Sequence, residues 1–277
     1  MWEGFDGGLP NRLSASGCKA KEAARTLGLA LALLRLEEKC AGDRKLCFPT
    51  TPALADASAS PGISWMSPRE LLSHVWRDLA GRHHCETSSA EVLLDELLGA
   101  YSEPSRHYHT IEHIASLLLQ LNDHGLAVAD RDAVALAMLF HDVIYDPRRR
   151  DNEEKSATLA RRRLSLLGFP DEVVAKVEHY ILATQHAQHF ETNDRDLSLL
   201  LDLDLSTLAA APAEYRVYAD AIRREYGDVP DELYRPARRR VLEGFLTRKR
   251  IYRTDDLHGL WEQRARANIA AEAAALA

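Results

Sequence analysis

The adjacent residues His141 and Asp142 are the part of this sequence best suited to chemistry. They directly follow the apolar run 133–140 (AVALAMLF), and Tyr145, Asp146 and Pro147 close the segment after them. An imidazole and a carboxylate placed against buried helix surface cost several kcal/mol unless they are paired, hydrogen-bonded or bound to a metal. This doublet therefore requires partners from elsewhere in the chain.

Suitable partners lie on both sides of the doublet. His107, His109 and His113 stand about one helix upstream, and Asp202 and Asp204 lie downstream in the apolar run LLLDLDLSTL. Imidazole and carboxylate ligands together suit a borderline divalent cation such as Mn, Fe, Co, Ni or Zn. The pattern predicts a metal-dependent hydrolase.

The spacing leaves two choices of ligand open. His109 and His113 are four residues apart and would share one face of a continuous helix, although His109 can also stand just before the helix begins. Asp202 and Asp204 are two residues apart, which is about 200° around a helix, so only one of them can face the metal. The other carboxylate is then expected to face solvent or to lie outside the ligand shell.

The elements that must position these residues are helices. From Ser67 onward, apolar residues recur at intervals of three and four, without the sustained alternation typical of strands. The predicted fold class is all-α, with Ser67 as N-cap and Pro68 as first residue of the first helix. Asp132 is expected to cap the helix that carries the doublet, which is apolar nearly all round and therefore central. The other helices are expected at about 90–101, 110–122, 152–168 (capped by Asp151 or Asn152), 171–186, 197–209, 213–226, 231–248 and 256–276.

Composition limits the classes of protein to consider. The 277 residues are 46% hydrophobic and 28% charged, enough for one core and an appendage. We expect an N-terminal extension over 1–65, partly helical and poorly ordered, and an all-helical catalytic domain over 66–277. A net charge of -7 argues against binding of a nucleic-acid duplex or an anionic membrane. No Gly-rich phosphate loop is present.

The cysteines and the one strongly apolar segment favour a cytoplasmic protein. The four cysteines show no CxxC spacing, so neither a zinc finger nor a disulfide framework is indicated. The segment 27–34 (LGLALALL) is far too short to span a membrane and has no basic leader. We therefore expect a soluble chain with reduced thiols.

Several strings in a fixed order resemble a known family. A histidine, the central His-Asp doublet and a later aspartate resemble the HD-domain superfamily of metal-dependent phosphohydrolases. The strings RHYHTIEHI, FHDVIYDP, DNEEKSA, LDLDLSTL and FLTRKRIY are similar to a bacterial subgroup described as predicted HD-superfamily phosphohydrolases. The resemblance extends over about residues 68–275.

The resemblance implies a compact multi-helix HD-domain bundle that holds one divalent ion (Mn, Fe, Co, Ni, Zn or Mg). Its ligands would be His113, His141, Asp142 and Asp204. His113 is favoured over His109 because the following Ile114 and Leu117 match the family's apolar steps, and Asp204 matches the final aspartate better than Asp202 does.

The resemblance also implies a reaction, hydrolysis of a phosphoester of a small molecule, with a nucleotide as the central expectation. Asp142 would orient the attacking water, and Asp146, Glu153 or His186 would carry the proton. The candidate groups for substrate binding are Arg106, His109 and His186. His186 and His189 could instead hold a labile second metal or be polar residues at a helix end.

Two other classes of function stay open at this stage. A non-catalytic metal- or nucleotide-binding regulatory module would keep the HD scaffold without turnover. A structural helical protein would pair its buried histidines and aspartates with each other and leave no gap for a cation. The C-terminal helices from Asp231 onward either cover the core, which we favour, or form a homodimer contact.

Overall fold

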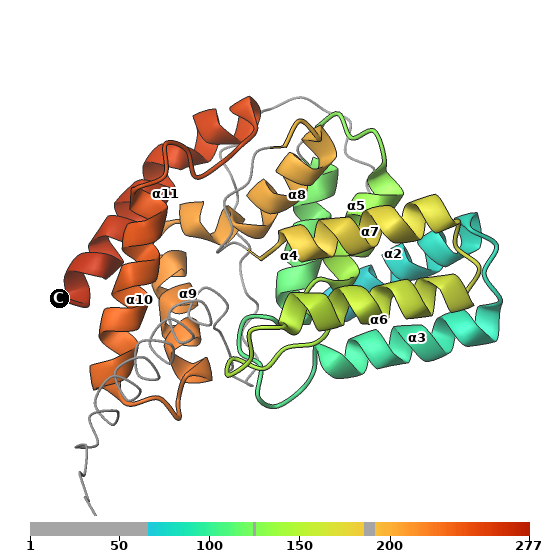
Figure 1. Ribbon diagram of the computed structural model, residues 1–277, viewed down its shortest axis with the longest axis horizontal. Coiled ribbons are helices and arrows are strands. Elements are labelled where there is room, and N and C mark those ends of the chain that lie inside the picture. The colour runs from blue at the N-terminus through green and yellow to red at the C-terminus, as the bar shows by residue number, and fades with distance from the viewer. Residues whose placement is uncertain (1–65, 124–125, 186–191) are drawn as a thin grey trace, which may run out of the picture.

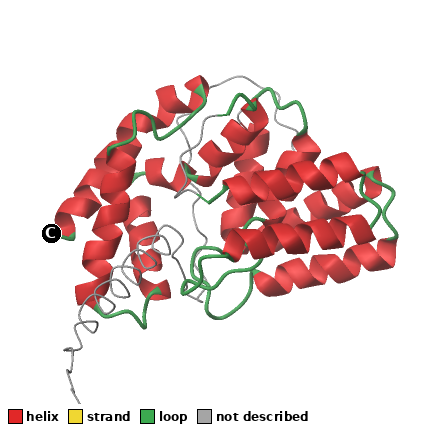
Figure 2. Cartoon of the chain, viewed as in Figure 1, coloured by secondary structure: helices red, strands yellow, loops and turns green. Residues whose placement is uncertain are grey.

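The computed structural model describes residues 66–123, 126–185 and 192–277 (Figure 1). Over these ranges the chain is all-α: it forms ten α-helices and one short 3-10 helix, without strands (Figure 2). The predicted extension over residues 1–65 lies outside the described residues. None of the helices described is long and apolar enough to cross a membrane.

The elements follow one another in the order α2 (Pro68–Arg82), α3 (Thr87–Ala100), α4 (Ile111–Asp123), α5 (Arg131–Phe140), α6 (Asn152–Leu166), α7 (Asp171–Ala183), α8 (Arg195–Asp204), η2 (Ser206–Ala209), α9 (Pro212–Glu225), α10 (Asp231–Leu246) and α11 (Asp255–Ala275). In Figure 1, α2, α3, α6 and α7 lie together on one side of the molecule, and α9, α10 and α11 lie on the other. α2 packs against α3 and α4, α7 against α5 and α6, and α11 against α10 and η2.

Helix α5 is the centre of the core, as its composition predicts. Each residue from Ala133 to Phe140 is buried, and the helix contacts α4, α6, α7 and α8. A helix that is apolar on every face must be surrounded in this way. His141 occupies the C-cap position, so α5 carries the doublet at its C-terminal end.

The cap of α5 differs from the prediction. Asp130, not Asp132, is the N-cap, and its carboxylate accepts a hydrogen bond from the Ala133 backbone N–H at 3.0 Å. The carboxylate of Asp132 instead accepts hydrogen bonds from Arg82 at 2.8 Å and pairs with His83 at 3.1 Å. The helix begins two residues before the sequence suggests because Asp130 supplies the cap, while the Asp132 carboxylate is used by Arg82 and His83.

The start of α2 is confirmed as predicted. Ser67 is the N-cap and Pro68 opens the helix. The Ser67 hydroxyl accepts from the Glu70 N–H at 3.3 Å, and the Glu70 carboxylate accepts from the Ser67 N–H at 2.7 Å. This reciprocal capping box satisfies two of the N–H groups that a helix start leaves without intrahelical partners.

Two other helix ends differ from the predictions, whereas Asp151 takes the N-cap position of α6 as predicted. The helix expected to extend to His186 ends at Ala183, because the Thr184 hydroxyl donates to the Ile181 carbonyl at 2.7 Å in a closing turn. His186 and His189 lie outside the described residues.

The helix expected over 197–209 divides into α8 and η2, which makes Asp204 the last residue of α8. Asp151 is the N-cap of α6, but its carboxylate bonds to Arg149 and caps no N–H group.

A buried ion pair joins the two C-terminal helices. Arg238 on α10, which is 1% exposed, donates to the two oxygens of Glu272 on α11 at 2.7 and 3.1 Å. The Tyr215 hydroxyl on α9 donates to the same carboxylate. Removing one partner would leave the other charge buried and uncompensated.

We therefore expect Arg238→Met to lower the free energy of unfolding by about 3–5 kcal/mol, measured by urea denaturation. The neighbouring Arg239 is the matched control, because it pairs with Glu243 on the exposed surface of α10. Arg239→Met should change stability little. Equal losses in the two variants would contradict the structural role of the buried pair.

Candidate metal centre

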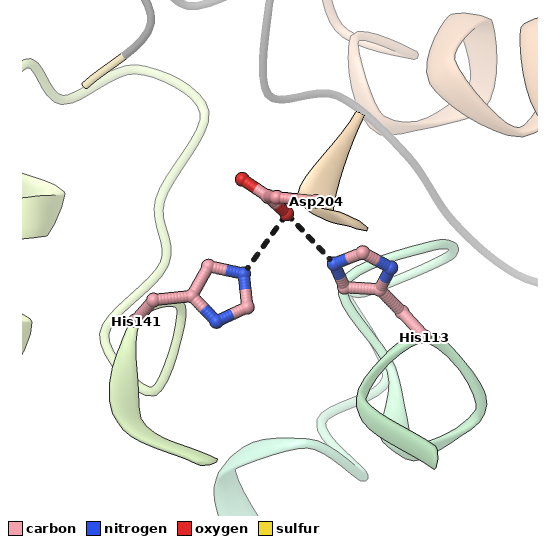
Figure 3. Close-up of side chains that lie close together, drawn as sticks. All are labelled: His113, His141 and Asp204. Carbon is pink, nitrogen blue, oxygen red and sulfur yellow. Dashed lines mark ion pairs between the residues drawn. The ribbon is translucent and has the colours of Figure 1, made fainter. Parts of the chain in front are cut away.

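Three of the predicted ligands converge from separate parts of the chain. His113 on α4, His141 at the end of α5 and Asp204 at the end of α8 each offer one ligand atom, and these atoms lie within 4.8 Å of one another. His113 Nε2 and His141 Nε2 both lie 3.4 Å from Asp204 Oδ1. Figure 3 shows the two imidazole rings approaching the carboxylate from different sides. We call these residues the three-residue group.

The separations suit a shared cation. Zinc–nitrogen and zinc–oxygen bonds of about 2.1 Å in a tetrahedral shell place neighbouring ligand atoms about 3.4 Å apart. The two observed nitrogen–oxygen distances have this value. They are longer than ordinary hydrogen bonds, which lie at about 2.7–3.2 Å.

The imidazole nitrogens that face the group are buried without hydrogen bonds. His113 Nε2 and His141 Nε2 are both buried and make no hydrogen bond of regular geometry, although His141 Nε2 forms an ion pair with the Asp142 carboxylate at 2.9 Å. The other nitrogen of His141, Nδ1, lies 2.9 Å from the Met138 carbonyl and donates to it, which leaves the Nε2 lone pair directed at the group. Metal-binding histidines are oriented by the same kind of hydrogen bond. A cation would satisfy both nitrogens.

The charges around His141 favour a positive species at its Nε2. Burial lowers the pKa of His141, but the carboxylates of Asp142 and Asp204 outweigh burial and raise the pKa well above its usual value. A divalent cation would supply the positive charge that these carboxylates attract.

Asp142 lies beside the three-residue group without joining it. Its Oδ2 is 2.9 Å from His141 Nε2, and the residue is 3% exposed. The 4.8 Å cluster of ligand atoms consists of His113, His141 and Asp204. The assignment of Asp142 as a fourth ligand therefore stays a prediction.

The choice between Asp202 and Asp204 is decided by their surroundings. Both oxygens of Asp202 are used by the segment before α11: Oδ1 accepts from the Arg253 N–H at 2.6 Å, and Oδ2 accepts from the N–H and hydroxyl of Thr254 at 2.8 and 2.7 Å. Asp202 is fully buried, so the solvent-facing alternative is wrong, and it lies outside the cluster of ligand atoms, as the other alternative expects. It attaches α8 to the start of α11, where Thr254 is the N-cap.

His109 takes a bridging position instead of a place in the group. It lies before α4 begins and is buried. Its Nε2 is 3.4 Å from Asp142 Oδ2, and its Nδ1 is 3.7 Å from Glu225 Oε2. The prediction that His113 is the ligand of this pair agrees with the cluster.

Glu225 is the residue near the site that the sequence did not reveal. It is the last residue of α9, and its side chain is 0% exposed. Its carboxylate accepts hydrogen bonds from the His107 N–H at 2.8 Å and from the Tyr145 hydroxyl. Glu225 follows two arginines and precedes a Tyr-Gly pair, a pattern that is typical of an exposed helix end. Nothing in the sequence therefore indicates that its side chain is buried near the site.

Arg106 has a structural role in place of the predicted substrate contact. It is 1% exposed, and Nη1 donates to the carbonyls of Asp142 and His109 at 2.6 and 3.2 Å. Nη2 donates to the Val143 carbonyl at 2.8 Å, and Nε bonds to the Glu103 carboxylate at 3.3 Å. All three of its nitrogens are used inside the protein, so the guanidinium holds the backbone of the doublet instead of a substrate.

The string DNEEKSA fixes the segment that follows the doublet. The Ser156 hydroxyl bonds to the N–H and the carbonyl of Ile144 at 3.1 and 3.3 Å. The Asn152 amide bonds to the N–H and the carbonyl of Asp146 at 3.2 and 2.9 Å. The first turns of α6 therefore hold residues 144–146 by their backbone.

The three residues expected to carry a proton have different surroundings. The Asp146 carboxylate accepts from Arg148 at 3.0 Å. Burial raises the pKa of Asp146, but the hydrogen bonds and charge of Arg148 and the charge of Arg149 together outweigh burial and lower the pKa. Glu153 is buried in the first turn of α6. His186 lies outside the described residues. The choice among them stays a prediction.

In comparisons of the chain with protein-family models, curated proteins and solved structures, no significant match was found. The resemblance to the HD-domain superfamily therefore depends on the sequence strings. The geometry independently supports a site that could hold a metal ion.

The two aspartates of α8 provide a matched test of the site. We expect Asp204→Asn to weaken binding of Zn or Mn by more than about 10-fold, since it removes a charged ligand. Asp202→Asn should retain metal binding but lower the free energy of unfolding by about 1–3 kcal/mol, because buried hydrogen bonds are lost. Competition with a chromogenic chelator measures the first effect and urea denaturation the second. Loss of metal in Asp202→Asn alone would reverse the assignment.

Proposed function

We propose that this protein is a metal-dependent phosphohydrolase of the HD-domain superfamily that cleaves a phosphoester of a small molecule, with a nucleotide as the expected substrate. The observation that carries the proposal is the convergence of His113, His141 and Asp204 with two buried imidazole nitrogens directed at one point. Their order along the chain, with Asp142 next to His141, is the order that the family resemblance implies.

A purely structural role for the group explains the geometry less well. Leaving a buried polar atom without a hydrogen bond costs about 1–3 kcal/mol. A structural cluster would be expected to close the gap between His113 Nε2, His141 Nε2 and the Asp204 carboxylate by hydrogen bonds. The 3.4 Å separations and the absence of those bonds favour a bound cation instead.

The chain would hold the cation through His113, His141 and Asp204, with Asp142 beside them. When bound, the metal supplies Lewis-acid chemistry: it lowers the pKa of a water molecule and polarises a phosphoester oxygen. Asp142 would orient the attacking water, and its position 2.9 Å from His141 Nε2, at the edge of the group, supports this role. Arg106 keeps this carboxylate in place by binding the Asp142 backbone carbonyl.

The enclosure of the site supports a small substrate. The side chains of His113, His141 and Asp204 are 3%, 2% and 11% exposed, so little of the group is open to solvent among the described residues. A phosphate of a nucleic-acid duplex could not enter such a site without melting or bending of the duplex. The net charge of -7 also disfavours a polyanion.

Phosphate release tests the proposal directly. The wild-type chain is assayed with a panel of nucleotides and other small phosphoesters in the presence of Mn, Co, Ni, Zn or Mg. We expect metal-dependent release that chelator abolishes and that His113→Ala and Asp204→Asn lower by at least about 100-fold, since either change removes a ligand. Asp228→Asn, an exposed aspartate after α9, is the control and should retain full activity.

Two results would count against the proposal. Release that is unaffected by chelator and by both ligand variants would exclude a role for the site. Tight metal binding without release on any substrate would favour the non-catalytic binding module.

A Glu225→Gln variant tests whether the groups around Asp142 affect metal binding and turnover. Glu225→Gln keeps the shape of the side chain but removes the charge that faces His109. Changes to groups that support metal ligands typically lower metal affinity or activity by about 10–100-fold, and we expect a loss in this range. Asp220→Asn, an exposed change on the same helix, should have no effect. Wild-type affinity and turnover in Glu225→Gln would show that His109 and Asp142 hold their positions without it.

A further inference from the structure

A row of polar side chains leads away from the candidate metal centre along the contact between α4 and α8. His113, Ser116 and Gln120 follow one another at intervals of three and four residues, so they share one face of α4. Opposite this face, the end of α8 and the start of η2 present Asp204 and Ser206. His113 Nε2 lies 3.4 Å from Asp204 Oδ1 (Figure 3), and Gln120 Nε2 donates to Ser206 Oγ at 3.0 Å. We call Ser116, Gln120 and Ser206 the polar cluster.

The polar cluster lies close to the metal centre. At a rise of about 1.5 Å per residue, Ser116 lies about 4.5 Å and Gln120 about 10 Å beyond His113 along the axis of α4. Ser206 follows Asp204 by two residues. Each residue of the cluster is half-buried, so part of it stays open to solvent. A molecule that binds the metal with one end would therefore reach the cluster with its other end.

The polar cluster keeps hydrogen-bonding capacity after its internal bonds are made. Gln120 Nε2 donates to Ser116 Oγ at 3.1 Å as well as to Ser206 Oγ, so both hydroxyls act as acceptors. Within the described residues, neither hydroxyl donates its own proton, and the Gln120 carbonyl oxygen accepts no hydrogen bond. Ser198 on α8 differs, because its hydroxyl donates to the Asp194 carbonyl at 2.9 Å. Two donors and one acceptor of the cluster are thus available to a ligand.

The hydroxyl groups of a sugar match these donors and this acceptor. A sugar hydroxyl can accept a hydrogen bond from a serine and donate one to the Gln120 carbonyl. The three side chains of the cluster are uncharged, so they offer a second phosphate no charge-assisted bond. Ligand sites typically fix the orientation of a small molecule with a few polar groups of this kind.

We propose that the polar cluster binds sugar hydroxyls of the substrate and thereby selects a phosphoester of a sugar or a nucleoside. The phosphate would lie at the metal centre and the sugar along α4. Ser116, Gln120 and Ser206 then determine specificity and take no part in the chemical step. This substrate class rests on the proposed phosphohydrolase function, but binding of the sugar does not require turnover.

The first test compares two substrates. KM is measured for ribose 5-phosphate, which carries sugar hydroxyls, and for p-nitrophenyl phosphate, which carries none. We expect Gln120→Met and Ser206→Ala each to raise KM for ribose 5-phosphate by about 5- to 10-fold, since each removes neutral hydrogen bonds. KM for p-nitrophenyl phosphate and both kcat values should change little.

Two further variants and a stability measurement separate recognition from folding. Ser206→Thr keeps the hydroxyl and should retain most of the preference for ribose 5-phosphate. Ser198→Ala is the matched control, because Ser198 is also half-buried but its proton is used within α8, and it should change neither KM. Urea denaturation shows that each variant is folded. Equal changes of KM for the two substrates, or no change, would overturn the proposal, because a cluster that only joins α4 to η2 affects both substrates alike.

The second test measures binding without turnover and separates this proposal from the phosphohydrolase proposal. The zinc-loaded full chain is titrated by calorimetry with the phosphonate analogue of ribose 5-phosphate and with ethylphosphonate, whose C–P bonds resist hydrolysis. If the wild type prefers the ribose analogue and Gln120→Met loses this preference, while no phosphoester is hydrolysed, the polar cluster stands and the proposed function fails. If p-nitrophenyl phosphate is hydrolysed but the wild type binds the ribose analogue no better than ethylphosphonate, the polar cluster fails and the function stands.

Discussion

The constraint on which the site depends is the pair of buried imidazole nitrogens that face the Asp204 carboxylate at 3.4 Å, farther than an ordinary hydrogen bond, with Asp142 as the nearer partner of His141 alone. A core tolerates such atoms only when another interaction compensates for their lost hydration. The Nδ1 bond of His141 to the Met138 carbonyl prevents the ring from turning its free lone pair elsewhere. A divalent cation is the species that satisfies both rings and the carboxylate together.

The motifs around the doublet form one hydrogen-bonded unit. Arg106, in the string RHYHTIEHI, binds backbone carbonyls of the doublet segment and of His109. Asn152 and Ser156, in the string DNEEKSA, bind the backbone that follows the doublet. Because the carbonyls and N–H groups of this irregular segment are bonded to side chains, the segment can be buried at the end of α5. The strings RHYHTIEHI and DNEEKSA therefore hold neighbouring parts of the same backbone segment.

The C-terminal helices contribute to the site through the end of α8. Asp202 binds the start of α11, and the Leu205 carbonyl accepts a hydrogen bond from the Tyr252 hydroxyl at 3.0 Å. Asp204 lies between these two anchors, so the position of this candidate ligand depends on the link between α10 and α11. This arrangement explains how a region without ligands of its own supports the site.

The sequence alone predicted the all-α class, the central position of α5 and the chain order of the candidate ligands, because apolar periodicity and the burial of a polar doublet are local properties. Helix geometry showed that Asp202 and Asp204 face different ways, and the family resemblance favoured Asp204, but neither could show which carboxylate meets the histidines. That choice, the structural role of Arg106 and the burial of Glu225 were decided by the tertiary structure. Each depends on partners far away in the chain, such as Thr254 for Asp202 and Tyr145 for Glu225, and only the packing of helices brings these residues into contact.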